Sequence, residues 1–167
     1  MKTKTKRLAL LSVMTSVALV LSYVELLIPP IWSAIPGIKL GLPNIIIIVV
    51  LYGFSVNDAA LVSFVRIGIV AVLFGNAMTF IYSVSGAALS LIIMALLKKT
   101  DSFSVVGVSI AGGVSHNIGQ ILAAMFLLKT MEIGYYMIVL SFTGIIAGVC
   151  IGILGSIVLK YFNKIKI

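Results

Sequence analysis

Three large polar side chains, His116, Asn117 and Gln120, lie close together in an otherwise apolar stretch. Together with small residues they recur at three- and four-residue steps, which places one stripe on one helical face: Ser109, Gly113, His116, Asn117, Gln120 and Ala124. Imidazole and amide groups in this pattern can bind a polar ligand. They can also join neighbouring helices, at about 0.6–2 kcal/mol per bond. Packing rarely needs three such large groups, so we favour a substrate-binding face.

Two ionisable residues, Glu25 and Arg66, also lie in or beside apolar runs. In lipid such residues are costly, and they therefore face a bundle interior or water. Glu25 can pair with Lys39, bind a cationic group of a ligand, or lie in interfacial water. Arg66 can anchor an anionic ligand, contact a partner subunit or lock the bundle. Asp58 lies two helical turns before Arg66, so a direct pair requires both side chains to reach.

Other candidates carry weaker signals. Asn76 and Tyr82 are placed to reach a ligand from the outer end of a helix, although Asn76 equally suits a helix cap. Small residues at four-residue steps favour close contact between helices. One such seam predicts packing within the chain: Gly144, Gly148 and Gly152. Another small-residue face is available to a helix of this chain or of a partner: Ala9, Ser12 and Ser16.

The elements that position these residues follow from composition. Hydrophobic residues make up 62% of the 167 residues and charged residues only 10%. Soluble domains average about 45–50% and about 25%, respectively. A chain this apolar has too little interior to cover its apolar surface in water, which excludes a soluble enzyme. Continuous apolar runs such as residues 45–51 favour membrane-spanning helices over barrel strands, which alternate.

The sequence predicts a single all-α membrane domain, a bundle of six transmembrane helices between residues 8 and 161. Segments 1–7 and 162–167 form a basic N-terminus and a basic tail. The predicted spans are residues 8–28, 40–54, 59–74, 78–97, 103–128 and 135–161. The second span is short and has Pro43 in its first turn, so a tilted crossing, a partly loop-covered one or a re-entrant segment remain open. A stiff outer loop at 29–39 follows the first span.

The charge distribution supports six spans with both termini in the cytoplasm. The net charge is +8, and the basic residues cluster at span ends rather than in one patch, so nucleic acid is not expected as a partner. Nine basic residues fall on the cytoplasmic side of the plasma membrane: Lys2, Lys4, Lys6, Arg7, Lys98, Lys99, Lys160, Lys164 and Lys166. Two fall outside: Lys39 and Lys129. This asymmetry obeys the positive-inside rule.

The sequence lacks the residues that several kinds of catalysis require. The chain has no phosphate-binding loop of the ATPase type. It contains two aspartates, Asp58 and Asp101, and no clustered acids that could hold Mg²⁺ for phosphoryl or prenyl transfer. His116 has neither the acid partner of a catalytic triad nor the companions of a metal site in its sequence neighbourhood. We therefore expect a protein that is not an enzyme and needs no metal or cofactor.

Three stretches resemble known membrane proteins. Residues 35–53, IPGIKLGLPNIIIIVVLYG, resemble the loop and second helix of S components of energy-coupling factor (ECF) transporters. Residues 73–94, LFGNAMTFIYSVSGAALSLIIM, and residues 113–124, GVSHNIGQILAA, resemble the Gx transporter family, also named heptaprenyl diphosphate synthase component I. The resemblance covers about residues 7–157, and its most specific part is the HNIGQ segment.

The resemblance implies an S-component-like fold that captures a small molecule, such as a vitamin or a quinone or isoprenoid precursor, in an outward-facing pocket. It implies an ECF transmembrane subunit and two ATPase subunits as partners, docked in the S components through an Ala-xxx-Ala motif on the first helix. Here Ser12 and Ser16, preceded by Ala9, stand nearest to that motif. The other family name implies a non-catalytic membrane subunit of a prenyl diphosphate synthase, and this alternative stays open.

Overall fold

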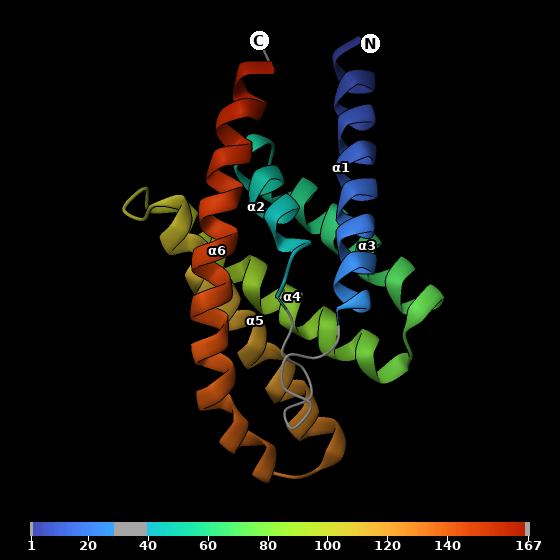
Figure 1. Ribbon diagram of the computed structural model, residues 1–167, viewed down its shortest axis with the longest axis vertical. Helices are drawn as coiled ribbons and strands as arrows, with labels where there is room; N and C mark the ends of the chain where they lie inside the picture. Colours follow the sequence, from blue (N-terminus) through green and yellow to red (C-terminus); the bar gives the residue numbers. More distant parts are fainter. Residues whose placement is uncertain (1, 29–39, 166–167) are drawn as a thin grey trace.

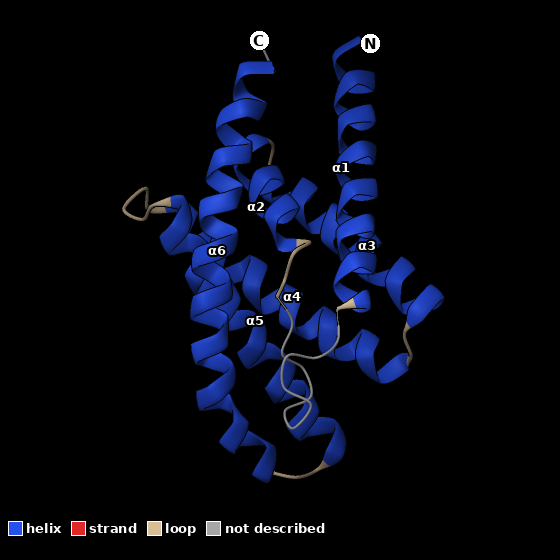
Figure 2. Ribbon diagram, viewed as in Figure 1, coloured by secondary structure: helices blue, strands red, loops and turns tan. Residues whose placement is uncertain are grey.

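The computed structural model describes residues 2–28 and 40–165, and every regular element among them is a helix (Figures 1 and 2). The elements in chain order are α1 (Lys2–Leu27), α2 (Asn44–Gly53), α3 (Val56–Phe74), α4 (Ala77–Lys99), α5 (Val105–Leu128), the short 3-10 helix η1 (Glu132–Tyr135) and α6 (Tyr136–Ile165). Within these two described ranges, five helices are long and apolar enough to cross a membrane. The predicted all-α membrane architecture is confirmed at this level.

The observed helices extend furthest beyond the predicted spans at the two ends of the chain. α1 begins at Lys2, so the basic segment expected before the first span is the start of that helix. α6 continues to Ile165, so most of the expected basic tail is its last turn. Lysine and arginine are good helix formers, and a helix leaving lipid loses nothing by continuing into water. These helices are therefore longer than their apolar segments.

α2 is the main departure from six full spans. We predicted a crossing over residues 40–54, but the helix has 10 residues. At 1.5 Å per residue it is about 15 Å long, half of a hydrocarbon core of roughly 30 Å. Gly41, with a left-handed φ of 73°, and Pro43 at the N-cap delay its start. Within the described part of the predicted second crossing, only Asn44–Gly53 is therefore helical.

Both termini lie at one end of the molecule (Figure 1), and contacts between distant segments join the helices there. Arg7 Nη2 pairs with Asp58 Oδ2 at 2.5 Å, which links the start of α1 to the start of α3. Lys98 Nζ donates to the Leu51 carbonyl oxygen at 2.6 Å, which links the end of α4 to the end of α2. The six α-helices therefore alternate in direction along the chain, so that α1 and α3, on either side of the short α2, run the same way.

Glycines let α6 approach α5 closely. A Cβ atom at Gly148 would lie 2.6 Å from Ile110 Cα, and one at Gly144 would lie 2.9 Å from the Gly113 oxygen. Gly152 approaches α5 in the same way, one turn further along. Such distances leave no room for side chains, so the two backbones pack directly. The predicted glycine seam thus faces α5.

On its other side α5 packs against α4. A Cβ atom at Gly119 would lie 2.7 Å from the Ser85 oxygen, and one at Gly86 would lie 2.8 Å from the His116 oxygen. α5 is therefore held between two helices by backbone contacts on both sides. These contacts fix its rotation about its own axis, and so the direction in which its polar face points.

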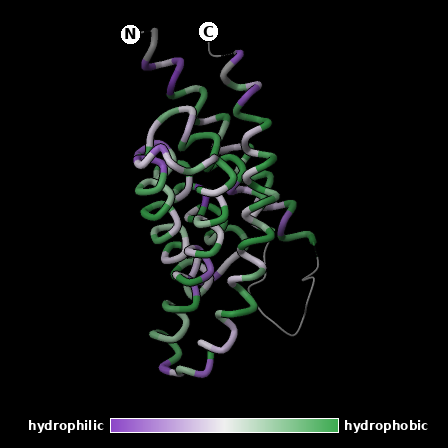
Figure 3. The backbone as a smooth tube through the Cα atoms, turned by 90° about the vertical axis from the view of Figure 1, so that its left-hand side faces the viewer, coloured by the Kyte–Doolittle hydropathy of each residue, from purple (hydrophilic) through white to green (hydrophobic). Residues whose placement is uncertain are grey.

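The apolar core is centred on α2, whose Val49, Val50 and Leu51 are 0% exposed. The long helices instead carry large apolar side chains on the outer surface, including Val72 at 86% and Phe126 at 83% exposure. Figure 3 shows hydrophobic residues along the helices and hydrophilic ones concentrated near their ends. Such a surface suits lipid and is unfavourable in water. The described helices are accordingly compatible with a multi-pass membrane protein.

Candidate functional site

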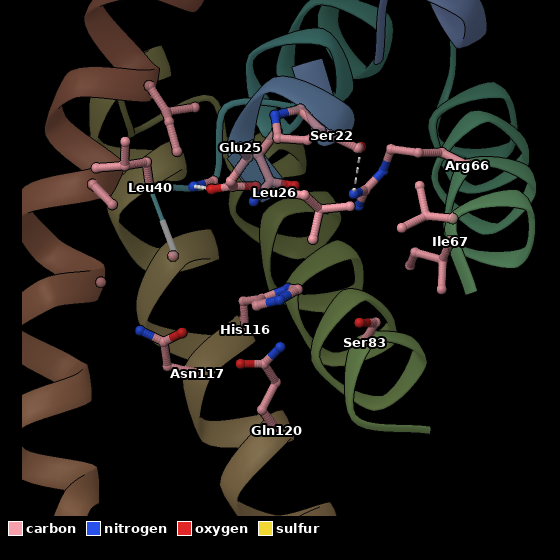
Figure 4. A pocket seen from close by; sticks show the side chains of 18 of the residues that line it. Ser22, Glu25, Leu26, Leu40, Arg66, Ile67, Ser83, His116, Asn117 and Gln120 are labelled. Carbon is pink, nitrogen blue, oxygen red and sulfur yellow. Dashed lines mark hydrogen bonds between the residues drawn. The ribbon is translucent and has the colours of Figure 1, made fainter. Parts of the chain in front are cut away.

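A cavity of about 280 Å³ lies at the start of α2, and all six α-helices contribute to its lining. Small-molecule sites usually measure about 300–1,000 Å³, so this one suits a compact ligand. Figure 4 shows the side chains that line it. The polar ones are Ser22, Glu25, Asn44, Arg66, Ser83, His116, Asn117 and Gln120.

The half-length of α2 explains where the cavity lies. In the half of the molecule nearer the termini, α2 packs against α1, α3 and α6 and fills the space between them. Asn44 is its first residue, and Leu40, Gly41 and Pro43, just before it, line the cavity. The cavity therefore lies just beyond the end of the helix that fills the core.

α5 brings the predicted stripe of His116, Asn117 and Gln120 to the cavity. Asn117 Nδ2 also donates to the Leu140 oxygen of α6 at 2.6 Å, so this amide joins two helices. Gln120 forms no hydrogen bond with another residue that the structure describes, and its amide points into the cavity (Figure 4). A Cβ atom at Gly86 would lie 2.9 Å from Gln120 Cγ and 3.1 Å from His116 Cε1. Gly86 therefore makes room for both side chains.

Arg66 reaches the cavity from α3. Its Nη1 donates to Ser22 Oγ of α1 at 3.3 Å, shown by a dashed line in Figure 4. Its Nε atom is buried and has no hydrogen-bond partner among the described residues. Ser22, only 4% exposed, donates its own hydroxyl to the Ala18 oxygen at 2.8 Å. A cationic group with unused donor capacity therefore borders the cavity.

Glu25 lies in the same lining and accepts a hydrogen bond from the Gly41 N–H, which ties the end of α1 to the approach to α2. It forms no direct ion pair with Arg66 among the residues described here. Its predicted pair with Lys39 falls outside the described residues. The cavity thus contains one anionic and one cationic side chain that are not in contact.

The considered pair between Asp58 and Arg66 is not formed. Asp58 instead pairs with Arg7 and accepts the Ser55 hydroxyl at 2.7 Å. The two residues lie at different levels of α3. Asp58 is in its first turn, beside the start of α1, whereas Arg66 lies two turns further along the helix. The structure therefore separates a charge pair at the end of the bundle from the charge at the cavity.

Asn76 and Tyr82 do not line the cavity. The Asn76 side chain accepts the Thr79 N–H at 2.9 Å, and the Thr79 hydroxyl accepts the Asn76 N–H at the same distance. This capping box accounts for Asn76 without a ligand. Tyr82 immediately precedes Ser83, which does line the cavity. Neighbouring helical residues point about 100° apart, so Tyr82 faces elsewhere.

The small-residue face of α1 stays exposed in this chain. Ala9, Ser12 and Ser16 are all exposed. The two hydroxyls donate to carbonyls of their own helix, Ser12 to Leu8 and Ser16 to Ser12, both at 3.0 Å. Because their hydrogen bonds are satisfied locally, they present a smooth surface that another helix can approach.

Sequence reasoning did not propose Ser22, Gly41, Asn44 or Ser83 as site residues, and it named none of the apolar lining residues. The signal for Ser22 and Ser83 was weak, because single serines in apolar helices usually bond to their own backbone. Gly41 and Asn44 flank Pro43, and that cluster of turn-forming residues was the available sign that α2 starts late.

The model of the family described as heptaprenyl diphosphate synthase component I matches residues 14–158. The chain belongs to this family. The matched segment includes every residue that lines the cavity. No curated protein and no solved structure matches the chain significantly.

In this component I family member, the cavity is equipped for recognition. It offers amide, imidazole and hydroxyl groups that can donate and accept hydrogen bonds, together with one charge of each sign. The described residues contain no group of three or more His, Cys, Asp or Glu side chains that could hold a metal ion. The arrangement can orient a compact polar molecule by several convergent hydrogen bonds.

Proposed function

We propose that this chain is the substrate-binding membrane subunit, or S component, of an ATP-driven importer of the ECF type. The observation that carries the proposal is a cavity, lined by all six α-helices, into which a membrane-type protein with an apolar outer surface brings eight polar side chains. Ionisable and large polar groups are rare within a membrane bundle, and where they gather they often mark a ligand site or a pathway. The cargo is a small molecule such as a vitamin or a quinone or isoprenoid precursor.

The orientation follows from the basic residues. When the end that carries both termini faces the cytoplasm, the positive-inside rule is satisfied. α1 then runs outward, and the lining residues Ser22 and Glu25 are near its outer end, which supports a cavity at mid-depth and in the outer half. A ligand arriving from outside the cell reaches the cavity from that side.

The transport energy comes from partners. The sequence contains no phosphate-binding loop, so the ATP-hydrolysing step belongs to two ATPase subunits that act through an ECF transmembrane subunit. The exposed face of Ala9, Ser12 and Ser16 supports a docking role for α1, because small residues allow close helix contact in lipid.

Replacing His116, Asn117 and Gln120 together by alanine tests the capture site. We expect loss of uptake and of any co-purified small molecule, measured by mass spectrometry of protein purified in mild detergent. The matched control is Leu122→Ala, on the exposed face of the same helix, which should keep both. Unchanged binding and uptake in the triple variant would show that the cavity is not the capture site.

The family description supports a second candidate, a non-catalytic membrane subunit associated with a prenyl diphosphate synthase. A pull-down from native membranes separates the two candidates. Recovery of a membrane subunit with paired ATPases supports the importer. Recovery of a soluble prenyl synthase without ATPases supports the second candidate, particularly when the triple variant retains that partner.

A further inference from the structure

We propose that Arg66 is the anion-binding residue of the cavity, and that the ligand carries a carboxylate or phosphate group that binds there. This inference rests on the proposed capture function and specifies the chemistry of its ligand. It concerns a residue outside the α5 stripe, on a helix that contributes no other charged side chain to the cavity.

The hydrogen bonding of Arg66 is incomplete. A guanidinium has five N–H donors in a rigid fork. The structure provides one acceptor at 3.3 Å, the neutral oxygen of Ser22, and leaves the buried Nε atom without a partner among the described residues. A buried charged donor without an acceptor is strongly unfavourable. Arginine is therefore poorly explained here as a fixed part of the empty bundle.

The neighbouring acid does not complete the site. Glu25 accepts the Gly41 N–H and is not in direct contact with Arg66. Its negative charge lines the same cavity and partly offsets the cation in the absence of ligand. The two charges thus form no direct ion pair among the described residues, and the guanidinium borders the cavity.

An oxyanion matches this space. Carboxylate and phosphate oxygens accept the parallel N–H groups of arginine in a bidentate pair, the strongest such contact in proteins. Arg66 lines the cavity, so an oxyanion that enters it can accept hydrogen bonds from the guanidinium. Weak polarity around the site strengthens the attraction. Amide groups of Asn117 and Gln120 remain for the uncharged part of the ligand.

Stability distinguishes this role from a structural one. When Arg66 serves the ligand, Arg66→Met removes an unsatisfied buried charge, and the unliganded protein should melt at the same or a higher temperature. When Arg66 locks the helices together, the same variant should melt at a lower temperature. The measurement is thermal unfolding of the purified protein in mild detergent.

Simple anions serve as probes of the site itself. The unfolding midpoint is measured in increasing sodium acetate or sodium phosphate against sodium chloride of equal ionic strength. We expect a saturable rise for the wild type, its loss in Arg66→Met, and about tenfold or more weaker binding in Arg66→Lys, which keeps the charge without the fork. Glu25→Gln should bind the anions more tightly. The preferred probe separates a carboxylate ligand from a phosphate ligand.

Lys99→Met is the matched control, because it removes an exposed cation at the far end of α4 and should respond as the wild type does. An Arg66→Met protein that responds like the wild type, or a wild type that responds equally to chloride, overturns the inference. Retention of the co-purified small molecule by Arg66→Met, with its loss in the triple variant, overturns only the role of Arg66. Retention by both variants overturns the capture function too.

Discussion

At the scale of single residues, the two amides of the α5 stripe have different surroundings. The Asn117 side chain donates a hydrogen bond to the Leu140 oxygen of α6, whereas the Gln120 side chain forms no hydrogen bond with the described part of the chain. A ligand therefore competes with the protein for Asn117 but not for Gln120. Substitutions at both residues should therefore weaken ligand binding, but only the substitution of Asn117 should also lower the stability of the fold.

Gln120→Ala should weaken ligand binding by about tenfold or more while leaving the unfolding midpoint nearly unchanged, because Gln120 has no hydrogen bond to lose within the described residues. Asn117→Ala should weaken binding and also destabilise the fold by about 1 kcal/mol, since the Leu140 oxygen loses a donor. Binding assays and thermal unfolding on the same preparations measure both effects. Equal destabilisation by the two variants would contradict this division.

At the scale of helices, the approach of α6 to α5 depends on the absence of side chains. Gly148→Ala places a Cβ atom 2.6 Å from Ile110 Cα, which is backbone and cannot move aside cheaply. We expect a loss of about 1–3 kcal/mol from overpacking. Because Gly113 and Gly144 on the same interface line the cavity, ligand binding should weaken as well.

Gly68 in α3 offers the matched control, since a Cβ atom there meets nothing within 4 Å. Gly68→Ala should leave binding intact and stabilise the helix by up to about 1 kcal/mol through helix propensity. Thermal unfolding of the two variants side by side measures the contrast. A similar loss in both would mean that packing against α5 is not the cause.

The short helix α2 also needs support at its end. Lys98 Nζ donates to the Leu51 oxygen, one of the carbonyls that a helix end leaves without an internal partner, and lies 5.1 Å from the centre of the Tyr52 ring. Lys98→Met should therefore lower stability by about 1 kcal/mol or more. Lys99→Met, at the exposed neighbouring position, should not, and unfolding in detergent compares them.

At the scale of the whole molecule, both termini and the α4–α5 turn are expected in the cytoplasm, and the α5–α6 turn outside. Single cysteines at Ser102 and Met131, both exposed, test this in a Cys150→Ala background. A membrane-impermeant thiol reagent on intact cells should label Met131→Cys, and Ser102→Cys only after permeabilisation. The reverse labelling pattern would mean that the cavity lies toward the cytoplasm, and it would contradict the proposal that the protein captures a substrate from outside the cell.

Much of the architecture was predictable from local pattern. Membrane insertion follows from composition. Helices follow from the unbroken apolar runs, because lipid admits only helices and closed barrels, and barrel strands alternate. The polar face of α5 follows from helical spacing, which needs no knowledge of other elements. The small-residue seam of α6 likewise predicted a close helix contact, although not that α5 was its partner.

The sequence by itself therefore determined the environment, the class of fold and the face of α5 that carries His116, Asn117 and Gln120. Only the tertiary structure decided that α2 stops halfway, that Asn76 is a cap, and that Arg66 turns to Ser22 rather than Asp58. The physical reason is the distance along the chain over which each signal acts. Composition and periodicity act within one helix, whereas the cavity depends on the depth and rotation of six helices relative to one another.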